Sequence, residues 1–455
     1  MNSPEWSREQ SARWVRDQIP PGGLFADQHW RISPVPLALP ASMVAELESL
    51  GRVLLQFYKA INLLYRQSVA GKQPEWIAHL YDQGKPASLL DWQRHPAFKG
   101  ELPRVIRPDL LWTEQGFALT ELDSVPGGIG LTAWLHRTYS QLALAAQKGN
   151  TAGEPRLIGG PDGMVEGFRS IFGDARRVHV AVSAESGSYR PEMEWLCGEL
   201  GRERFQVTGV DADPTEDGDA IYRFFELFDL ANIPASGAWL EKAAEKRIRL
   251  TPAYKPVLEE KLSLALLWNR NLRSYWRQEL GDGFLTRLQK IVPYSWVVDP
   301  TPLPPHAAIP ELGLTDWQQL KQLSQKERDL ILKVSGYSEE AWGARGVYLG
   351  SDLSQADWSS AVDKAVGHFD RSPFVLQRYH KPKVVDFSYL DFTAGQEVPM
   401  PSRVRLCPYY FVAGDGDAAR AQLGGVLATA CPADKKIIHG MRDAVLAPCS
   451  IQSPL

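Results

Sequence analysis

Three carboxylates and an arginine lie close together in one short stretch of the chain. Arg107 and Asp109 are two residues apart, and so are Glu121 and Asp123, so each pair faces one side of an extended segment. If the chain folds back at Gly116, the two pairs lie side by side. Carboxylate oxygens are ligands that Mg²⁺ prefers, and an arginine beside them can hold a phosphate oxygen. We therefore predict a magnesium site at Asp109, Glu121 and Asp123, with Arg107 facing a phosphate.

The alternative is an ordinary solvated hairpin whose acidic residues are merely exposed. Spacing alone favours this alternative, because short motifs often match by chance. The apolar neighbours oppose it, since they indicate that the hairpin is partly buried: Leu110, Leu111, Phe117, Leu119 and Leu122.

A lysine and a glycine loop later in the chain could also meet phosphates. Lys333 interrupts an apolar run at 330–334, where a lysine is ordinarily an edge residue or one that extends its amino group to water. Ten residues on, Gly343 and Gly346 would let backbone N–H groups approach phosphate oxygens, and Arg345 adds charge. The loop is not a Walker A motif, because no Gly-Lys-Ser/Thr follows. An ordinary turn is the alternative.

Two further segments are candidates for contact with a nucleotide. The apolar strand expected at 374–379 turns polar at Gln377, Arg378 and Tyr379, and such a strand end can line an adenine slot. By itself it would be an ordinary core strand. Lys261, in a helix expected at 257–280, would by itself be a surface residue.

Composition excludes several classes of protein. The chain has 455 residues, 44% of them hydrophobic and 23% charged, which suits a packed soluble protein. The net charge of −4 argues against nucleic acid as the main partner, and no apolar run is long enough to span a membrane. Four scattered cysteines form neither a zinc motif nor a disulfide framework, so we expect a reduced, cytoplasmic protein.

The periodicity of apolar residues predicts a mixed α/β chain without internal repeats. The expected elements are helices over 41–66 and onward to 95, a hairpin at 105–125, a β-α-β unit at 177–212, a long helix at 257–280, a linker at 300–310, strands at 331–336 and 374–380, a helix near 354–368, and short strands with glycine turns in the final 55 residues.

Taken together and in order, these segments resemble the synthetase domain of glutathionylspermidine synthase and its relatives, the circularly permuted ATP-grasp ligases. Arg107-Pro-Asp109 is similar to the family's Arg-x-Asp, and Glu121-Leu-Asp123 to its Glu-x-Asn. Lys261 and Lys333 resemble its two nucleotide lysines, and Gly343–Gly346 its phosphate-covering loop. The strand end at 375–379 lies where the family has its adenine hinge.

The resemblance implies a circularly permuted, ATP-grasp-like α/β fold, taken as one unit over 1–455. It would have a helical N-terminal part (1–100), the metal-binding hairpin and loop (101–150), a small central parallel-sheet subdomain (151–255) and a C-terminal ATP-grasp part (256–455). It also implies ATP and Mg²⁺ as cofactors.

The activity implied is an ATP-dependent carboxylate–amine ligase that releases ADP and phosphate. Arg107 and Lys333 would be catalytic, and small-molecule or peptide carboxylates and amines would be the substrates. The alternative is a nucleotide-binding module of the same fold that has lost catalysis.

The sequence departs from the family pattern next to the hairpin. Asp123 stands where the family has asparagine, and the loop with Ser124, Gly127 and Gly128 differs from the family's Thr-Pro-Thr type. A substrate would approach at this loop, so the family's substrates are not carried over. The C-terminal arginines Arg403 and Arg405 fall where the family has substrate contacts, but they do not align uniquely.

Overall fold

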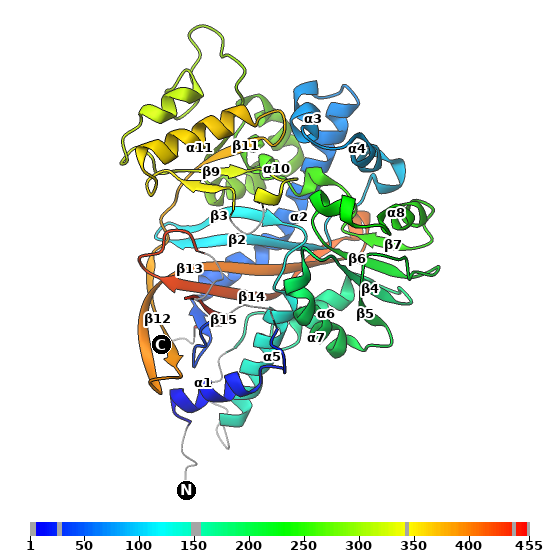
Figure 1. The fold of residues 1–455 in the computed structure, drawn as a ribbon, viewed down its shortest axis with the longest axis vertical. Helices are drawn as coiled ribbons and strands as arrows, with labels where there is room; N and C mark the ends of the chain where they lie inside the picture. Colours follow the sequence, from blue (N-terminus) through cyan, green and yellow to red (C-terminus); the bar gives the residue numbers. More distant parts are fainter. Residues whose placement is uncertain (1–5, 25–29, 147–155, 342–344, 439–442, 453–455) are drawn as a thin grey trace.

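Three β-sheets and the helices that cover them make up the computed structural model (Figure 1). The structure describes residues 6–24, 30–146, 156–341, 345–438 and 443–452. No helix in these ranges is long and apolar enough to cross a membrane. The mixed α/β class expected from the sequence is confirmed, and the three sheets meet around one pocket.

The largest sheet has seven strands in the order β1-β15-β14-β13-β2-β3, with β12 paired to β13. The bounds are β1 (Leu37–Leu39), β2 (Val105–Thr113), β3 (Gly116–Asp123), β12 (Val384–Asp391), β13 (Gln396–Ala413), β14 (Arg420–Pro432) and β15 (Val445–Ile451). The expectation of short strands near the C-terminus was wrong for β13 and β14, and it is confirmed for β15, which has seven residues. β13 and β14 are 18 and 13 residues long and pair with each other, which lengthens both.

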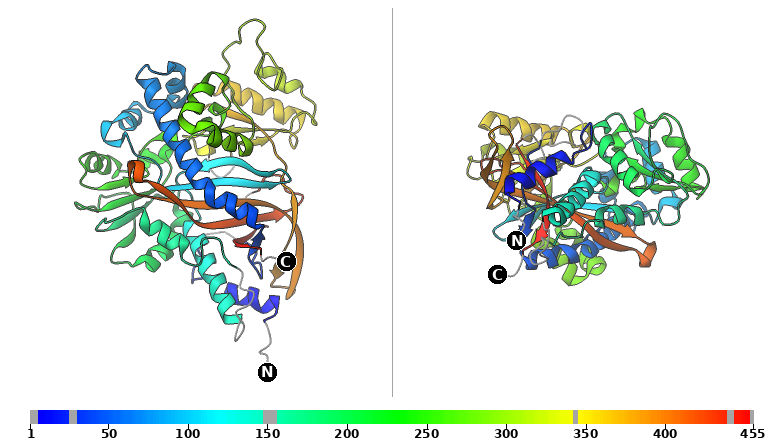
Figure 2. Two further views of the ribbon diagram at one scale, coloured as in Figure 1. Left: turned by 180° about the vertical axis from the view of Figure 1, so that it is seen from behind. Right: turned by 90° about the horizontal axis from the view of Figure 1, so that it is seen from below.

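The two faces of the large sheet have different roles, because side chains alternate along each strand. On β13, Leu406 and Tyr410 pack in a core cluster with helix α2 (Ala41–Val69). Arg405, Cys407 and Tyr409, which alternate with them, line the pocket on the other face. The view from behind in Figure 2 shows α2, in blue, crossing in front of the sheet.

A second sheet is antiparallel, in the order β10-β9-β11-β8. Its bounds are β8 (Ser295–Val297), β9 (Leu330–Val334), β10 (Val347–Leu349) and β11 (Phe374–Arg378), and helix α11 (Gln355–Gly367) covers one face. The strands and the helix expected here are confirmed. The predicted linker at 300–310 contains neither helix nor strand.

The third sheet is parallel, in the order β5-β4-β6-β7. Its elements are β4 (Val178–Val182), α7 (Arg190–Leu200), β5 (Phe205–Thr208), β6 (Ala220–Phe224), α8 (Ser236–Ala244) and β7 (Arg249–Thr251). The expected β-α-β unit is therefore confirmed, and β6 and β7 extend it.

The remaining helices join these layers. They are α1 (Arg8–Asp17), α3 (Glu75–Asp82), α4 (Ala87–Arg94), α5 (Ile129–Ala146) and α6 (Gly163–Ser170). α5 and α6 pack between the large sheet and α7, so a single apolar cluster connects the large and parallel sheets. The helical character expected up to residue 95 is confirmed.

The prediction of one long helix over 257–280 was wrong. The chain forms short pieces there: η4 (Pro256–Leu258), α9 (Leu262–Leu266), η5 (Arg270–Leu272) and the start of α10 (Arg273–Ile291). The reason is competition for backbone donors, since the N–H of Lys261 donates to Ser335 O and that of Leu262 to Ser335 Oγ. Asn269 then starts a new helical turn by accepting from Asn271 N–H.

The contact of α2 with the large sheet gives a stability test. A Cβ at Gly51 would lie 2.5 Å from Cδ1 of Tyr410, a buried ring whose hydroxyl donates to Leu47 O. Gly51→Ala should therefore lower the free energy of unfolding by about 1–3 kcal/mol, because the anchored ring cannot move away. Gly237→Ala on α8, where nothing lies within 4 Å, should be neutral or stabilise by up to about 1 kcal/mol. Urea denaturation would show both, and equal effects would contradict the packing.

Candidate functional site

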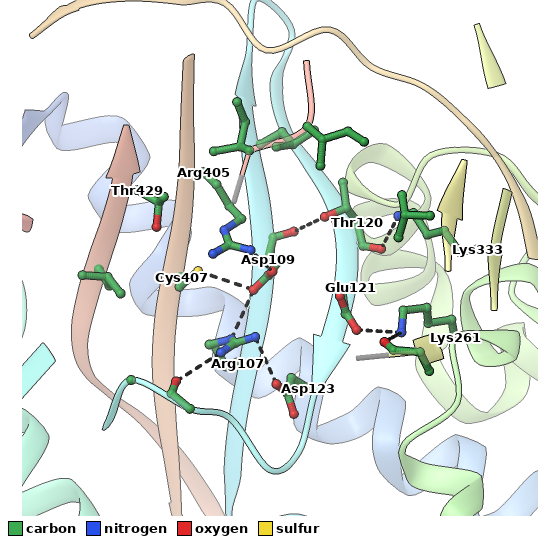
Figure 3. A pocket seen from close by; sticks show the side chains of 18 of the residues that line it. Arg107, Asp109, Thr120, Glu121, Asp123, Lys261, Lys333, Arg405, Cys407 and Thr429 are labelled. Atoms are coloured by element: carbon green, nitrogen blue, oxygen red, sulfur yellow. Dashed lines mark hydrogen bonds and ion pairs between the residues drawn. The ribbon is translucent and has the colours of Figure 1, made fainter. Parts of the chain in front are cut away.

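The β2–β3 hairpin brings the predicted residues together. Arg107 pairs with Asp123 and Asp109 with Glu121 across the two strands, and all four line one pocket of about 490 Å³ (Figure 3). The register shifts between Asp109 and Leu110, which leaves Thr120 as an extra residue on β3. The adjacency predicted from the spacing is confirmed.

Asp109 is the buried centre of the hairpin. Its Oδ1 lies 3.1 Å from Arg107 Nε, and its Oδ2 accepts a 2.8 Å hydrogen bond from Arg405 Nη1 on β13. The thiol of Cys407 donates to Oδ1 at 3.4 Å. Burial raises the pKa of this carboxyl, but the two arginines outweigh burial and hold the pKa below its usual range. Asp109 is therefore an ionised carboxylate between two guanidinium groups.

The other two carboxylates also face cations. Arg107 Nη2 lies 3.0 Å from Asp123 Oδ2, and Lys261 Nζ lies 2.7 Å from Glu121 Oε1. Burial raises the pKa of Asp123, with Arg107 opposing it. Within the described residues, no group of three or more His, Cys, Asp or Glu side chains could hold a metal ion by itself. Magnesium binding at Asp109, Glu121 and Asp123 therefore stays a prediction, and phosphate or water oxygens would have to supply further ligands.

The two lysines reach the hairpin from the side of the antiparallel sheet. Lys333 on β9 is buried, and its Nζ donates to Thr120 O at 2.9 Å and to Gln377 Oε1 at 3.0 Å. It is neither an edge residue nor one that reaches water, because β9 lies between β10 and β11. Burial lowers the pKa of Lys333 to about 8. The bulge at Thr120 thus gives the lysine a carbonyl partner.

Lys261 is also buried, just before α9. Besides its ion pair with Glu121, its Nζ donates to Ala341 O at 3.3 Å. Burial lowers the pKa of Lys261, but the nearby carboxylates, Glu121 first, outweigh burial and raise it. Both lysines therefore point at consecutive residues of β3, which places two amino groups along one wall of the pocket.

In the expected adenine hinge, at 377–379, most hydrogen-bond donors are already bonded to acceptors within the protein. The side-chain amide of Gln377 is buried and bridges Lys333 and Ser295 Oγ. The N–H of Arg378 donates to Tyr294 O, and that of Tyr379 donates to Asp329 O. The three predicted residues line the pocket together with His380. An adenine base bound here would contact the end of β11, beyond the N–H groups of Arg378 and Tyr379, which already donate within the protein.

The expected glycine loop is described in part. Gly343 lies outside the described residues, whereas Arg345 lines the pocket and Gly346 lies directly before β10. The N–H of Gly346 donates to Glu340 O, and a Cβ there would lie 2.7 Å from both that oxygen and Val334 Cγ2. Gly346 is therefore required by close packing of the loop on β9, and contact with a phosphate stays a prediction.

The expected substrate loop borders the pocket beside Arg107. Gly127 and Gly128 line it, and the carbonyl of Gly127 accepts from Arg107 Nη1 at 3.2 Å and from Tyr409 Oη at 2.8 Å. Ser124 is buried and lines a smaller neighbouring cavity of about 70 Å³. Glu226 lines both cavities, and burial together with Glu259 raises its pKa to about 8.

Sequence reasoning missed residues that the pocket draws from distant segments. They are Cys407, Tyr409 and Thr429 on the large sheet, and Ser186, Ser188, Tyr189 and Glu226 from the parallel-sheet region. Arg405 was noted but had no assigned place. The two-residue spacing of 405, 407 and 409 was a signal that these side chains share a face, but only the pairing of β13 with β2 shows that this face contains Asp109.

The comparisons with known proteins concern the fold. No family model and no curated protein matches the chain. The structure aligns with a glutathione synthetase-like effector from Globodera pallida, solved in apo form, over 98% of this chain and 96% of the effector, with a TM-score of 0.55 and 10% identity. The fold is glutathione synthetase-like. At this identity the likeness concerns architecture alone.

A second solved structure matches less well. It is a protein provisionally named as a gamma-glutamylcysteine synthetase from Methylobacillus flagellatus KT, with a TM-score of 0.41 and 13% identity over 92% of this chain and 90% of that one. At this score the match does not bear on the fold. The finer resemblance to glutathionylspermidine synthase, and the circular permutation, stay predictions.

The charge balance at Asp109 can be tested by its effect on stability. Asp109→Asn should lower the free energy of unfolding by about 3 kcal/mol, because it leaves two partly buried arginines without the buried carboxylate that they share. Glu121→Gln should cost less than about 1 kcal/mol, because Glu121 is partly exposed, the amide oxygen can still accept from Lys261, and Lys261 keeps Ala341 O as a second acceptor. Urea denaturation of the two variants provides the measurement.

The stability difference between the wild type and Asp109→Asn should depend on pH in a defined direction. The folded-state pKa of Asp109 is lowered, so the ionised carboxylate contributes stability above its unfolded pKa of about 3.9 and loses it as pH falls through the folded value. The difference between the wild type and Asp109→Asn should shrink below about pH 4. A difference that persists unchanged at lower pH would contradict the ion pairing.

Proposed function

We propose that this protein is an ATP-dependent carboxylate–amine ligase. In the proposed reaction a substrate carboxylate attacks the γ-phosphate of ATP, and an amine then displaces phosphate from the acyl phosphate. The products are an amide, ADP and phosphate. The substrates proposed are small-molecule or peptide carboxylates and amines, and no side-chain nucleophile takes part.

The observation that carries this proposal is the pair of buried lysines facing the carboxylate hairpin. Lys261 and Lys333 come from segments next to the antiparallel sheet, and their partners Glu121 and Thr120 O lie on the large sheet. A pocket between two sheets, lined by amino groups on one wall and carboxylates on the other, suits a polyanion that carries a divalent cation. The glutathione synthetase-like fold supports the same function.

The donor set fits Mg²⁺ together with a nucleotide. Mg²⁺ in phosphate sites is usually held by one or two carboxylates and by phosphate oxygens, so Glu121, Asp123 and Asp109 need not converge on one point. The ion would neutralise charge that develops on the phosphates. Lys261 and Lys333 bind the phosphate chain, and Arg107 stabilises the transferring phosphoryl group.

The alternative function is a nucleotide-binding module without catalysis. One solved structure with this fold is named an effector, and that name is compatible with a role other than catalysis. Turnover distinguishes the two functions, since both predict binding of MgATP.

The first test is product formation. Purified protein with MgATP should release ADP and phosphate in equal amounts when a suitable acid and amine are both present. Glu121→Gln should reduce metal-dependent nucleotide binding at least about tenfold, because a charged ligand is lost. Glu114→Gln in the exposed turn of the same hairpin is the matched control. Tight MgATP binding without turnover over a broad panel of acids and amines favours the alternative, and absence of MgATP binding overturns both.

The second test concerns the charge on Lys333. Because its pKa is about 8, the lysine loses its charge as pH rises through that value, and the affinity for MgADP should fall above pH 8. Lys333→Met should weaken MgADP binding at pH 7 by about tenfold or more, through loss of a charged hydrogen bond. It should also flatten the decline at alkaline pH. Lys321→Met, a partly exposed lysine of the same region, is the control. Titration calorimetry from pH 6.5 to 9.5 would decide.

A further inference from the structure

The loop between β3 and α5 is compressed between two layers of the protein. A Cβ at Gly127 would overlap the ring of Tyr189, and a Cβ at Gly130 would overlap the backbone oxygen of Glu192. Gly128 has a φ of +85°, and a Cβ there would lie 2.7 Å from Tyr409 Oη. These close approaches explain why three of the four residues from 127 to 130 are glycine. The loop is therefore held by its neighbours on both sides.

A buried carboxylate from another layer anchors the far end of this loop. Glu192, in the first turn of α7, is fully buried, and its two oxygens accept 2.7 Å hydrogen bonds from the N–H groups of Gly128 and Leu131. These amides lie at the N-terminus of α5, an 18-residue helix whose first N–H groups have no intrahelical acceptor. A carboxylate is the favoured partner for this end of a helix. The parallel-sheet region thus fixes the loop through one side chain.

The near end of the loop is fixed to the arginine of the hairpin. The carbonyl of Gly127, one residue before the Gly128 amide held by Glu192, accepts from Arg107 Nη1 and from Tyr409 Oη. The other contacts of Arg107 are with Asp109 and Asp123. If those carboxylates were to hold a cation, the neutral Gly127 carbonyl would remain as an acceptor for the guanidinium.

We propose that Glu192 is a positioning residue, which acts through the Gly127–Leu131 segment to hold Arg107 against the transferring phosphoryl group. This proposal rests on the ligase function proposed above. Glu192 touches neither the main pocket nor the smaller cavity, because it is absent from the lining of both. Its effect passes along one peptide unit, from the Gly128 amide to the Gly127 carbonyl. Through Glu192 the parallel-sheet region therefore contributes to catalysis from outside both cavities.

Glu192 and Arg107 bind opposite ends of the same peptide unit, between Gly127 and Gly128. Burial raises the pKa of Glu192 to about 7, and the backbone N–H groups and Arg107 oppose this shift. Tyr189, Tyr222 and Tyr409 are titratable groups that sense its charge, and burial keeps them neutral by raising their pKa values. The ionised form of Glu192 accepts both amide hydrogen bonds.

The positioning role is tested with Glu192→Gln. The side chain keeps its shape, but its NH2 group would face one of the two backbone N–H groups and could not accept a hydrogen bond from it. Glu194→Gln, a solvent-facing position on the same helix, is the matched control. Hydrogen exchange should show lost protection in peptides spanning 124–133 of Glu192→Gln, with protection of α7 and the parallel sheet unchanged. Unchanged protection of the loop overturns the proposal, whether or not the protein is a ligase.

The second measurement connects Glu192 to Arg107. In steady-state kinetics, Glu192→Gln should lower kcat about tenfold with less than about twofold change in the KM for ATP, since one oriented hydrogen bond is lost at the phosphoryl group. In an Arg107→Met background the same change should have no further effect on kcat, because the residue it positions is gone. Additive losses, or a rise in KM with kcat unchanged, overturn the proposal.

If no acid–amine pair supports turnover, the affinity for ADP with Mg²⁺ and aluminium fluoride is measured in place of kcat. The same variants are compared, namely Glu192→Gln, Arg107→Met and the double variant. A protein that binds this phosphoryl mimic but turns nothing over contradicts the ligase function, while the cycle still tests the positioning role. A protein that binds no nucleotide removes the phosphoryl part of the proposal, and it leaves the exchange experiment to decide whether Glu192 orders the loop.

Discussion

The carboxylate of Asp109, shared by Arg107 and Arg405, is the interaction on which the pocket depends. It joins β2 to β13 at the centre of the large sheet, and it does so with charge inside a buried layer. A buried ion pair adds little net stability, because the cost of desolvation offsets the attraction. Its value here is geometric: it fixes two guanidinium groups on the pocket face, while the opposite face of the same strands packs against α2.

Every predicted cation described in the pocket has an acidic or carbonyl partner within the protein. Lys261 faces Glu121, Lys333 faces Thr120 O and Gln377, and Arg107 faces two carboxylates. This balance keeps buried charges compensated in the absence of a ligand. A nucleotide carrying a divalent cation would exchange partners on both sides at once, with phosphates taking the lysines and the metal taking the carboxylates. Neither half of that exchange is complete without the other, so metal and nucleotide should bind cooperatively.

Local sequence signals were sufficient where one segment determines its own structure. The apolar spacing of α2, the turn at Gly116 and the β-α-β pattern near 177–212 all predicted the elements found. The signals failed where distant segments decide. The segment at 257–280 has the composition of a helix, but Ser335 takes two of its N–H groups, and this competition cannot be read from residues 257–280 themselves. The place of Arg405 depended on the pairing of β13 with β2, across almost 300 residues of sequence separation.

The same distinction separates the two halves of the pocket. The half that would meet phosphates is built from side chains whose charge and spacing are visible in the sequence, because phosphate recognition needs cations and a metal needs carboxylates. The other half is bordered by a glycine loop, by Tyr189 and Glu226 from the parallel-sheet region, and by Tyr409. At that end the sequence shows only that glycines are present. The structure gives the reason, because Tyr189, Tyr409 and Glu192 lie too close to leave room for a Cβ atom. Shape at this end is set by close contacts between layers. The sequence therefore predicts which residues would meet phosphates but does not identify a substrate.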